Sequence, residues 1–142
     1  MKSLISIIFF SLILNKTLNA EIIVLKNCYK PQDTKFEKFE YKINTEEKTI
    51  KEIFIYTDEY ALKKNTSKIN LLNFYLKYYE EQYAKGHRRH VFKKEFRGET
   101  IIDINLNTQK IIRSSVDKDG KIENQLISCA IWKKIKIKKI FY

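Results

Sequence analysis

The chain has 142 residues, of which 44% are hydrophobic and 32% charged, and its 28 basic and 17 acidic side chains give a formal charge of +11. A domain of this length can bury roughly two thirds of the surface of its unfolded chain, so it can form a core without obligatory cross-links. After residue 20 no apolar run approaches the roughly 20 residues that a membrane-spanning helix needs, which argues against such a helix in the rest of the chain.

Residues 1–20 have the pattern of an export signal. Lys2 precedes an apolar run at residues 4–14 that is interrupted only by serine, and a polar tail ends at Ala20. We predict cleavage after Ala20, with an uncleaved anchor as the alternative. The remaining residues 21–142 keep 26 basic and 17 acidic side chains, a formal charge of +9. We expect them to form a single β-rich domain that is periplasmic or secreted.

The first half of this domain alternates apolar and polar residues with a period of two. Residues 21–29 are apolar and β-branched and predict a first strand. Residues 39–56 predict a hairpin that turns at 44–48, because Phe39, Tyr41 and Ile43 alternate with polar residues. Residues 58–68 lose this period and predict a loop with at most one helical turn.

Residues 69–85 fit two templates. As a strand they place Phe74 and Leu76 on one face, and as a helix they place Leu72, Leu76 and Tyr79 on one side. Aromatic density favours the strand, and the lack of β-branched residues favours the helix. We predict a strand, with an α+β fold carrying one helix near 69–85 as the alternative.

The second half repeats the pattern. Residues 89–97 alternate and predict one strand, and residues 99–115 predict a central hairpin that turns at Asn107. After a turn, residues 122–132 predict a further strand, and 133–142 a final edge strand with its isoleucines inward and its lysines outward. The whole pattern predicts an all-β fold: an antiparallel meander of seven or eight strands that curls toward a small barrel.

The two cysteines, Cys28 and Cys129, lie near the two ends of the predicted domain. Exported proteins mature where thiols oxidise, so we predict that the two form a disulfide, with two buried free thiols as the alternative. A nucleophilic cysteine is disfavoured, because no histidine lies near either one in the sequence.

Positive charge is concentrated in two segments. Residues 85–97 hold six basic residues and one acid, and residues 133–139 hold five lysines and no acid. If these strands are neighbours, they form one anion-binding face. Its members are Arg89, Lys93, Arg97, Lys134, Lys136 and Lys138. The alternative is codon bias of an AT-rich genome, since lysine outnumbers arginine 24 to 4; the shortage of arginine also argues against specific nucleic-acid recognition.

The only histidines, His87 and His90, could supply an acid–base pair or two metal ligands. Three residues apart on a strand, however, they point to opposite faces. The sequence contains no phosphate-binding loop, Ser-His-Asp arrangement, CxxC pair or zinc-ligand spacing. We therefore predict a protein that is not an enzyme and uses no cofactor or metal. A small secreted nuclease-like hydrolase that uses His87 or His90 is the alternative.

An aromatic cluster in residues 74–83 predicts either core packing or, in a lipocalin-like carrier, a cavity for an apolar ligand. Its members are Phe74, Tyr75, Tyr78, Tyr79 and Tyr83.

The turn sequences INTEEK at 43–48 and LNTQK at 106–110 are alike, and Cys129 precedes Trp132. With the export signal, these features resemble short uncharacterised exported proteins of AT-rich marine bacteria. The resemblance covers the second half of the chain and implies no activity. The sequence as a whole predicts an exported binding protein for an anionic envelope component, such as a polymer or lipid head groups, or for a protein partner.

Overall fold

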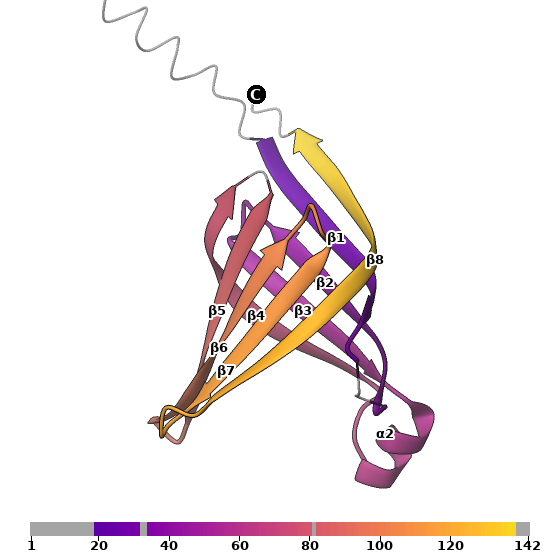
Figure 1. Cartoon of the computed structure of the whole chain (residues 1–142), viewed down its shortest axis with the longest axis vertical. Coiled ribbons are helices and arrows are strands. Elements are labelled where there is room, and N and C mark those ends of the chain that lie inside the picture. The colour runs from indigo at the N-terminus through magenta and orange to yellow at the C-terminus, as the bar shows by residue number, and fades with distance from the viewer. Residues whose placement is uncertain (1–18, 32–33, 81, 139–142) are drawn as a thin grey trace, which may run out of the picture.

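The computed structural model describes residues 19–31, 34–80 and 82–138. In it eight strands pair in sequence order and the last pairs with the first, so the sheet closes into an antiparallel barrel (Figure 1). The strands are β1 (Asn19–Tyr29), β2 (Phe36–Asn44), β3 (Thr49–Tyr56), β4 (Ile69–Glu80), β5 (Tyr83–Phe92), β6 (Glu95–Asn105), β7 (Lys110–Asp117) and β8 (Ile122–Lys138). The predicted all-β meander is confirmed. The expected export signal lies outside the described residues, apart from residues 19 and 20, which begin β1.

The two ends of the barrel differ. In the view of Figure 1 the upper end carries the β2–β3, β4–β5 and β6–β7 turns, with the first residues of β1 and the last of β8. The lower end carries the β5–β6 and β7–β8 turns on one side and the helix α2 (Asp58–Lys64) on the other. We use "upper end" and "lower end" in this sense below.

The β2–β3 and β6–β7 hairpins share one turn geometry. Asn44 Oδ1 accepts hydrogen bonds from the backbone N–H groups two and three residues later, and Asn105 Oδ1 does the same in the second hairpin. Each turn ends in a residue with positive φ, Lys48 or Gln109. The residue equivalent to Asn44 is therefore Asn105 and not Asn107, so the sequence alignment of the two turns was wrong by two positions.

The stretch 69–85 is not a helix. Residues 69–80 form β4, as predicted, and turn into β5 at Tyr83. Gly86 lies inside β5, where a Cβ atom would come within 2.8 Å of Ile50 Cδ1. The helix is α2, which Thr57 caps by accepting a hydrogen bond from the N–H of Tyr60. No helix in the described part of the chain is long and apolar enough to cross a membrane.

β8 is one continuous strand, and the predicted edge strand at 133–142 is its second half. Its residues up to Lys138 pair with β1, whereas pairing with β7 ends at Ser128, so residues 133–138 have a paired strand on one side only, as an edge strand does. Residues 139–142 lie outside the described part. The predicted parity is also wrong. Ile135 is 45% exposed, whereas Lys134 pairs with Ile23, which is completely buried. Asn27 of β1 has a φ of +52°, and the pairing of β1 with β2 shifts register there, so the inward positions of β1 change from Leu25 to Cys28. The register between β1 and β8 is unbroken, so β8 changes parity together with β1.

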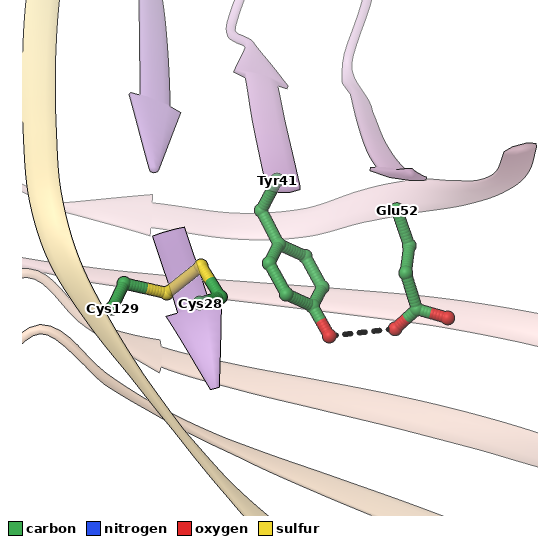
Figure 2. The surroundings of a disulfide bond; sticks show 4 residues. All are labelled: Cys28, Tyr41, Glu52 and Cys129. Carbon is green, nitrogen blue, oxygen red and sulfur yellow. Dashed lines mark hydrogen bonds between the residues drawn. A yellow bond between two sulfur atoms is a disulfide. The ribbon is translucent and has the colours of Figure 1, made fainter. Parts of the chain in front are cut away.

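The first and last strands are also joined covalently. Cys28 of β1 and Cys129 of β8 form a disulfide with an S–S distance of 2.04 Å, which confirms the predicted bond (Figure 2). Inward-facing apolar residues of the eight strands fill the barrel around it. The fully enclosed ones are Ile23, Leu25, Ile43, Ile50, Ile102, Ile111 and Ile127.

We expect reduction of this disulfide to lower the free energy of unfolding by about 2 to 4 kcal/mol, because it closes a loop of 101 residues in the unfolded chain. Urea denaturation with and without reductant measures the change. The double variant Cys28→Ser/Cys129→Ser is the control and should not respond to reductant. An unchanged midpoint on reduction of the wild type, or two titratable thiols in the purified protein, would contradict this prediction.

Candidate functional site

The six predicted anion-binding cations do not form one face. Arg89, Lys93 and Arg97 lie on the β5–β6 hairpin at the lower end, whereas Lys134 and Lys136 lie near the upper end of β8. β8 begins at the lower end with Ile122, and the twelve residues from there to Lys134 span about 40 Å of extended chain. The backbone of Lys138 continues β8, and its side chain is outside the described part of the structure. The hairpin is therefore the stronger candidate for a binding surface.

The prediction of one strand over residues 89–97 is wrong, and this hairpin was not predicted. The chain instead reverses between Phe92 and Glu95, which pair with each other. Lys93 and Lys94 occupy the two central turn positions with φ values of +49° and +63°. Two-residue turns with positive φ at both positions usually carry Asn or Gly, and no such residue marks this one. Residues 88–97 are called the basic hairpin below.

The tip of the basic hairpin exposes apolar side chains between cations. Val91, Phe92 and Phe96 are 57%, 58% and 41% exposed. The Arg89 guanidinium lies 4.9 Å from the centre of the Phe96 ring, and Lys93 Nζ lies 5.5 Å from that of Phe92. These cation–π contacts hold positive charge directly against exposed rings.

The charge of the basic hairpin is strongly positive. It contains five basic residues and one acid, Glu95, for a formal charge of +4. Glu95 forms an ion pair of 3.2 Å with Arg97, and both side chains are exposed. An exposed pair of this kind contributes little, so most of the positive charge stays available to an anionic partner.

At the upper end, the lysines of β8 face an acidic partner. Lys134 Nζ lies 3.2 Å from Glu21 Oε2, which also accepts a hydrogen bond from the Tyr79 hydroxyl at 2.8 Å. Burial opposes ionisation of Glu21, but the bonds from Tyr79 and Lys134, with the charge of Lys136, lower its pKa below the ordinary value. Lys134 is thus partly neutralised within the barrel.

The two histidines point to opposite faces of β5, as predicted. His87 Nε2 lies 2.7 Å from Glu99 Oε2 on the outer side, and His90 Nε2 lies 2.8 Å from Thr100 Oγ1 on the inner side. They therefore form no acid–base pair with each other. Across residues 19–31, 34–80 and 82–138, no group of three or more His, Cys, Asp or Glu side chains could hold a metal ion.

The aromatic cluster of residues 74–83 is divided between the two faces of the sheet. Phe74 belongs to the core, and Tyr79 faces the upper end of the barrel next to Glu21. Tyr75, Tyr78 and Tyr83 are exposed on the outside. The tyrosines are therefore not brought together around an internal space.

A chain of polar side chains crosses the barrel interior and was not predicted. The Tyr41 hydroxyl donates to Glu52 Oε2 at 2.7 Å, as Figure 2 shows, and Arg113 Nε donates to the same oxygen at 3.1 Å. Arg113 Nη1 then donates to Ser115 Oγ at 3.2 Å, and this hydroxyl lies 3.4 Å from that of Thr100. Together with His90, these residues are called the interior polar chain below.

The interior polar chain left a signal in the sequence. Glu52 shares the inward parity of Ile50, and Arg113 shares that of Ile111. Charged residues at core positions of two strands are expected to pair, because an isolated buried charge is too costly. Burial and the neighbouring Glu52 carboxylate raise the pKa of Tyr41 well above its ordinary value, so its hydroxyl remains a donor.

Comparison of the chain with protein-family models, with curated proteins and with solved structures found no match. The class of protein is therefore defined by the fold and the site alone: a closed eight-stranded antiparallel barrel with a basic hairpin at one end.

We expect Glu52→Gln to lower the free energy of unfolding by about 2 to 4 kcal/mol, because it leaves the Arg113 charge unpaired inside the barrel. The expected loss is below that of a fully enclosed pair, since the Arg113 side chain is 20% exposed. Urea denaturation measures it. Tyr41→Phe removes one hydrogen bond and no charge, and should cost only about 1 kcal/mol. Equal losses in the two variants would contradict the assignment.

His90 should make the protein less stable in mild acid. Burial and the charges of Arg88 and Arg113 lower the pKa of His90 below 6.5, so the folded protein takes up this proton less readily than the unfolded chain. Stability is therefore lost as pH falls below about 6.5. Unfolding measured at pH 7 and pH 5.5 should show a smaller loss in His90→Gln than in the wild type. Parallel losses in both proteins would rule out this role.

Proposed function

We propose that this chain is an exported, non-enzymatic binding protein that docks on an anionic phospholipid surface through its basic hairpin. The observation that carries the proposal is the tip itself, where Val91, Phe92 and Phe96 are exposed among five basic residues. Apolar side chains surrounded by lysine and arginine are typical of surfaces that enter the head-group region of a bilayer.

The aromatic residues favour a lipid surface over a charged polymer. Binding of a charged polymer requires only the cations. Transfer of exposed rings from water to the acyl boundary of a bilayer is favourable and adds to the affinity for lipid. Each Lys or Arg near an anionic surface contributes about 1 kcal/mol, and burial of a Phe side chain contributes about 1.5 to 3 kcal/mol. Because the rings are only half exposed in the free protein, about half of that burial remains to be gained.

The turn residues support selection for charge. Lys93 and Lys94 adopt the positive φ that Asn or Gly would adopt with less strain. The chain therefore places two cations at a position where they weaken the hairpin. The two lysines do not stabilise the fold, but they would strengthen binding to an anionic surface.

Export is supported by the apolar segment at residues 4–14 and by the disulfide, which suits an oxidising compartment. The hydrolase alternative has less support, because the hydrogen bond of His90 goes to Thr100, a hydroxyl that is only 1% exposed. The carrier alternative also has less support, because large apolar side chains fill much of the barrel interior.

The test is sedimentation with vesicles of phosphatidylcholine mixed with phosphatidylglycerol. Lys93→Asn/Lys94→Gly removes two charges and gives the turn its preferred residues. We expect this variant to bind the vesicles about thirtyfold more weakly while its stability is equal to or above that of the wild type. Lys63→Gln/Lys64→Gln of α2 is the matched control, because it removes the same charge from exposed positions outside the hairpin.

A second variant separates the lipid from the polymer. Phe92→Ser/Phe96→Ser should weaken vesicle binding and leave retention on heparin unchanged. Equal vesicle binding by the wild type and the lysine variant, or equal weakening by the two lysine variants, would overturn the proposed docking site. Loss of heparin retention with unchanged vesicle binding in the lysine variant would assign the hairpin to an anionic polymer instead.

A further inference from the structure

A cleft of about 420 Å³ opens at the lower end among residues of β5 to β8. His90 and Arg97 of the basic hairpin line it, whereas the turn residues Lys93 and Lys94 do not. Four residues of the interior polar chain line it, His90, Thr100, Arg113 and Ser115. Its volume lies within the range of sites that hold small molecules.

Arg113 is only partly engaged by the protein. Its hydrogen bonds use Nε, which donates to Glu52, and Nη1, which donates to Ser115. Among the bonds of the described residues, the Nη2 amino group remains for another acceptor. The Glu52 carboxylate holds the guanidinium in place from the side of the core, and Arg113 keeps a fifth of its side chain exposed.

The acids around the cleft are mostly engaged elsewhere. Asp117 accepts hydrogen bonds from the backbone N–H groups of Asp119 and Lys121 in the β7–β8 turn. Glu99 pairs with His87 on the outer side of the sheet, and Glu123 lies at the exposed rim. These three carboxylates line the cleft, but in the described part of the chain only Glu52 forms an ion pair with Arg113.

Arg113 lies beside His90 in the cleft, whose lining also includes two further cations, Arg97 and Lys121, and the three acids named above. After burial, the charges of Arg88 and Arg113 are the largest causes that lower the pKa of His90, together with that of His87. The imidazole is accordingly neutral at pH 7 and can donate one hydrogen bond. Guanidinium, hydroxyl and imidazole groups together are donors that suit the oxygens of an anion.

We propose that this cleft binds a small soluble oxyanion, the carboxylate or phosphate group of a ligand, through Arg113, Ser115 and His90. Arg113 Nη2 and the Ser115 hydroxyl donate to the anion, and Thr100 positions the imidazole through its bond to Nε2. This inference does not depend on the docking of the hairpin on lipid.

The test follows the His90 imidazole by NMR while inorganic phosphate, and in a second arm acetate, is added to the full protein. We expect saturable shifts with a dissociation constant of about 1 mM or tighter for at least one of the two anions. The bound anion should also raise the pKa of His90 toward its ordinary value, since it offsets the neighbouring arginines. The arm with the tighter binding identifies the phosphate or the carboxylate as the preferred group.

Two variants test the assignment. Glu52→Gln/Arg113→Gln removes both charges and so leaves no unpaired one, and it should weaken binding of the preferred anion at least tenfold. If that variant does not fold, Ser115→Ala is measured in its place. It removes one hydrogen bond to the charged anion and should weaken binding about tenfold. Lys93→Asn/Lys94→Gly is the control and should bind the anion as the wild type does.

Three results would overturn the inference: no saturable shift at His90 with either anion, unchanged binding in the Ser115 variant, or equal weakening in the hairpin control. The last result would place the anion at the Lys93–Lys94 turn instead. Vesicle binding and anion binding are measured separately, so failure of one proposal leaves the other standing.

Discussion

The structure depends on the pairing of its first and last strands. Ten residues of β1, from Asn19 to Tyr29, match partners on β8, and the bond between Cys28 and Cys129 lies within this ladder. Without that pairing, the meander would be an open sheet with two long unpaired edges, which are prone to aggregate. Closure pairs the backbone groups of β1 with those of β8 and gives every strand an inner face that can be buried.

Closure also creates a barrel interior in which any buried charged side chain needs a partner of opposite charge. Inward positions are mostly Ile and Leu, but Glu52 of β3 and Arg113 of β7 face each other across the barrel. Each charge is tolerable only because the other is present, and Tyr41 and Ser115 complete their hydrogen bonds. The same pair orients one guanidinium at the floor of the lower cleft, so a structural ion pair and a candidate binding group are one feature.

The closed barrel supplies enough stability for its lower end to carry residues that destabilise the fold. The β5–β6 turn holds two lysines in left-handed conformations and exposes Phe92 and Phe96 to water. A small domain tolerates such costs where the rest of its structure supplies stability, here a closed sheet and a cross-link. The basic hairpin and the lower cleft lie at the same end, whereas the upper end carries the first residues of β1, the last of β8 and three turns.

The sequence by itself determined most of the strand pattern, the all-β class, the disulfide partners Cys28 and Cys129, and the opposite faces of the two histidines. These follow from local alternation and from chemistry that does not need distant contacts. Only the tertiary structure decided the rest. The bulge at Asn27 reversed the parity of β8, the Lys93–Lys94 turn carried no Gly or Asn signal, and barrel closure separated Lys134 from Arg89. The parity of β8 and the separation of the two cations depend on pairing between strands distant in the sequence, which local sequence does not encode. The turn is local, but its lysines adopt positive φ values that residue preferences do not predict.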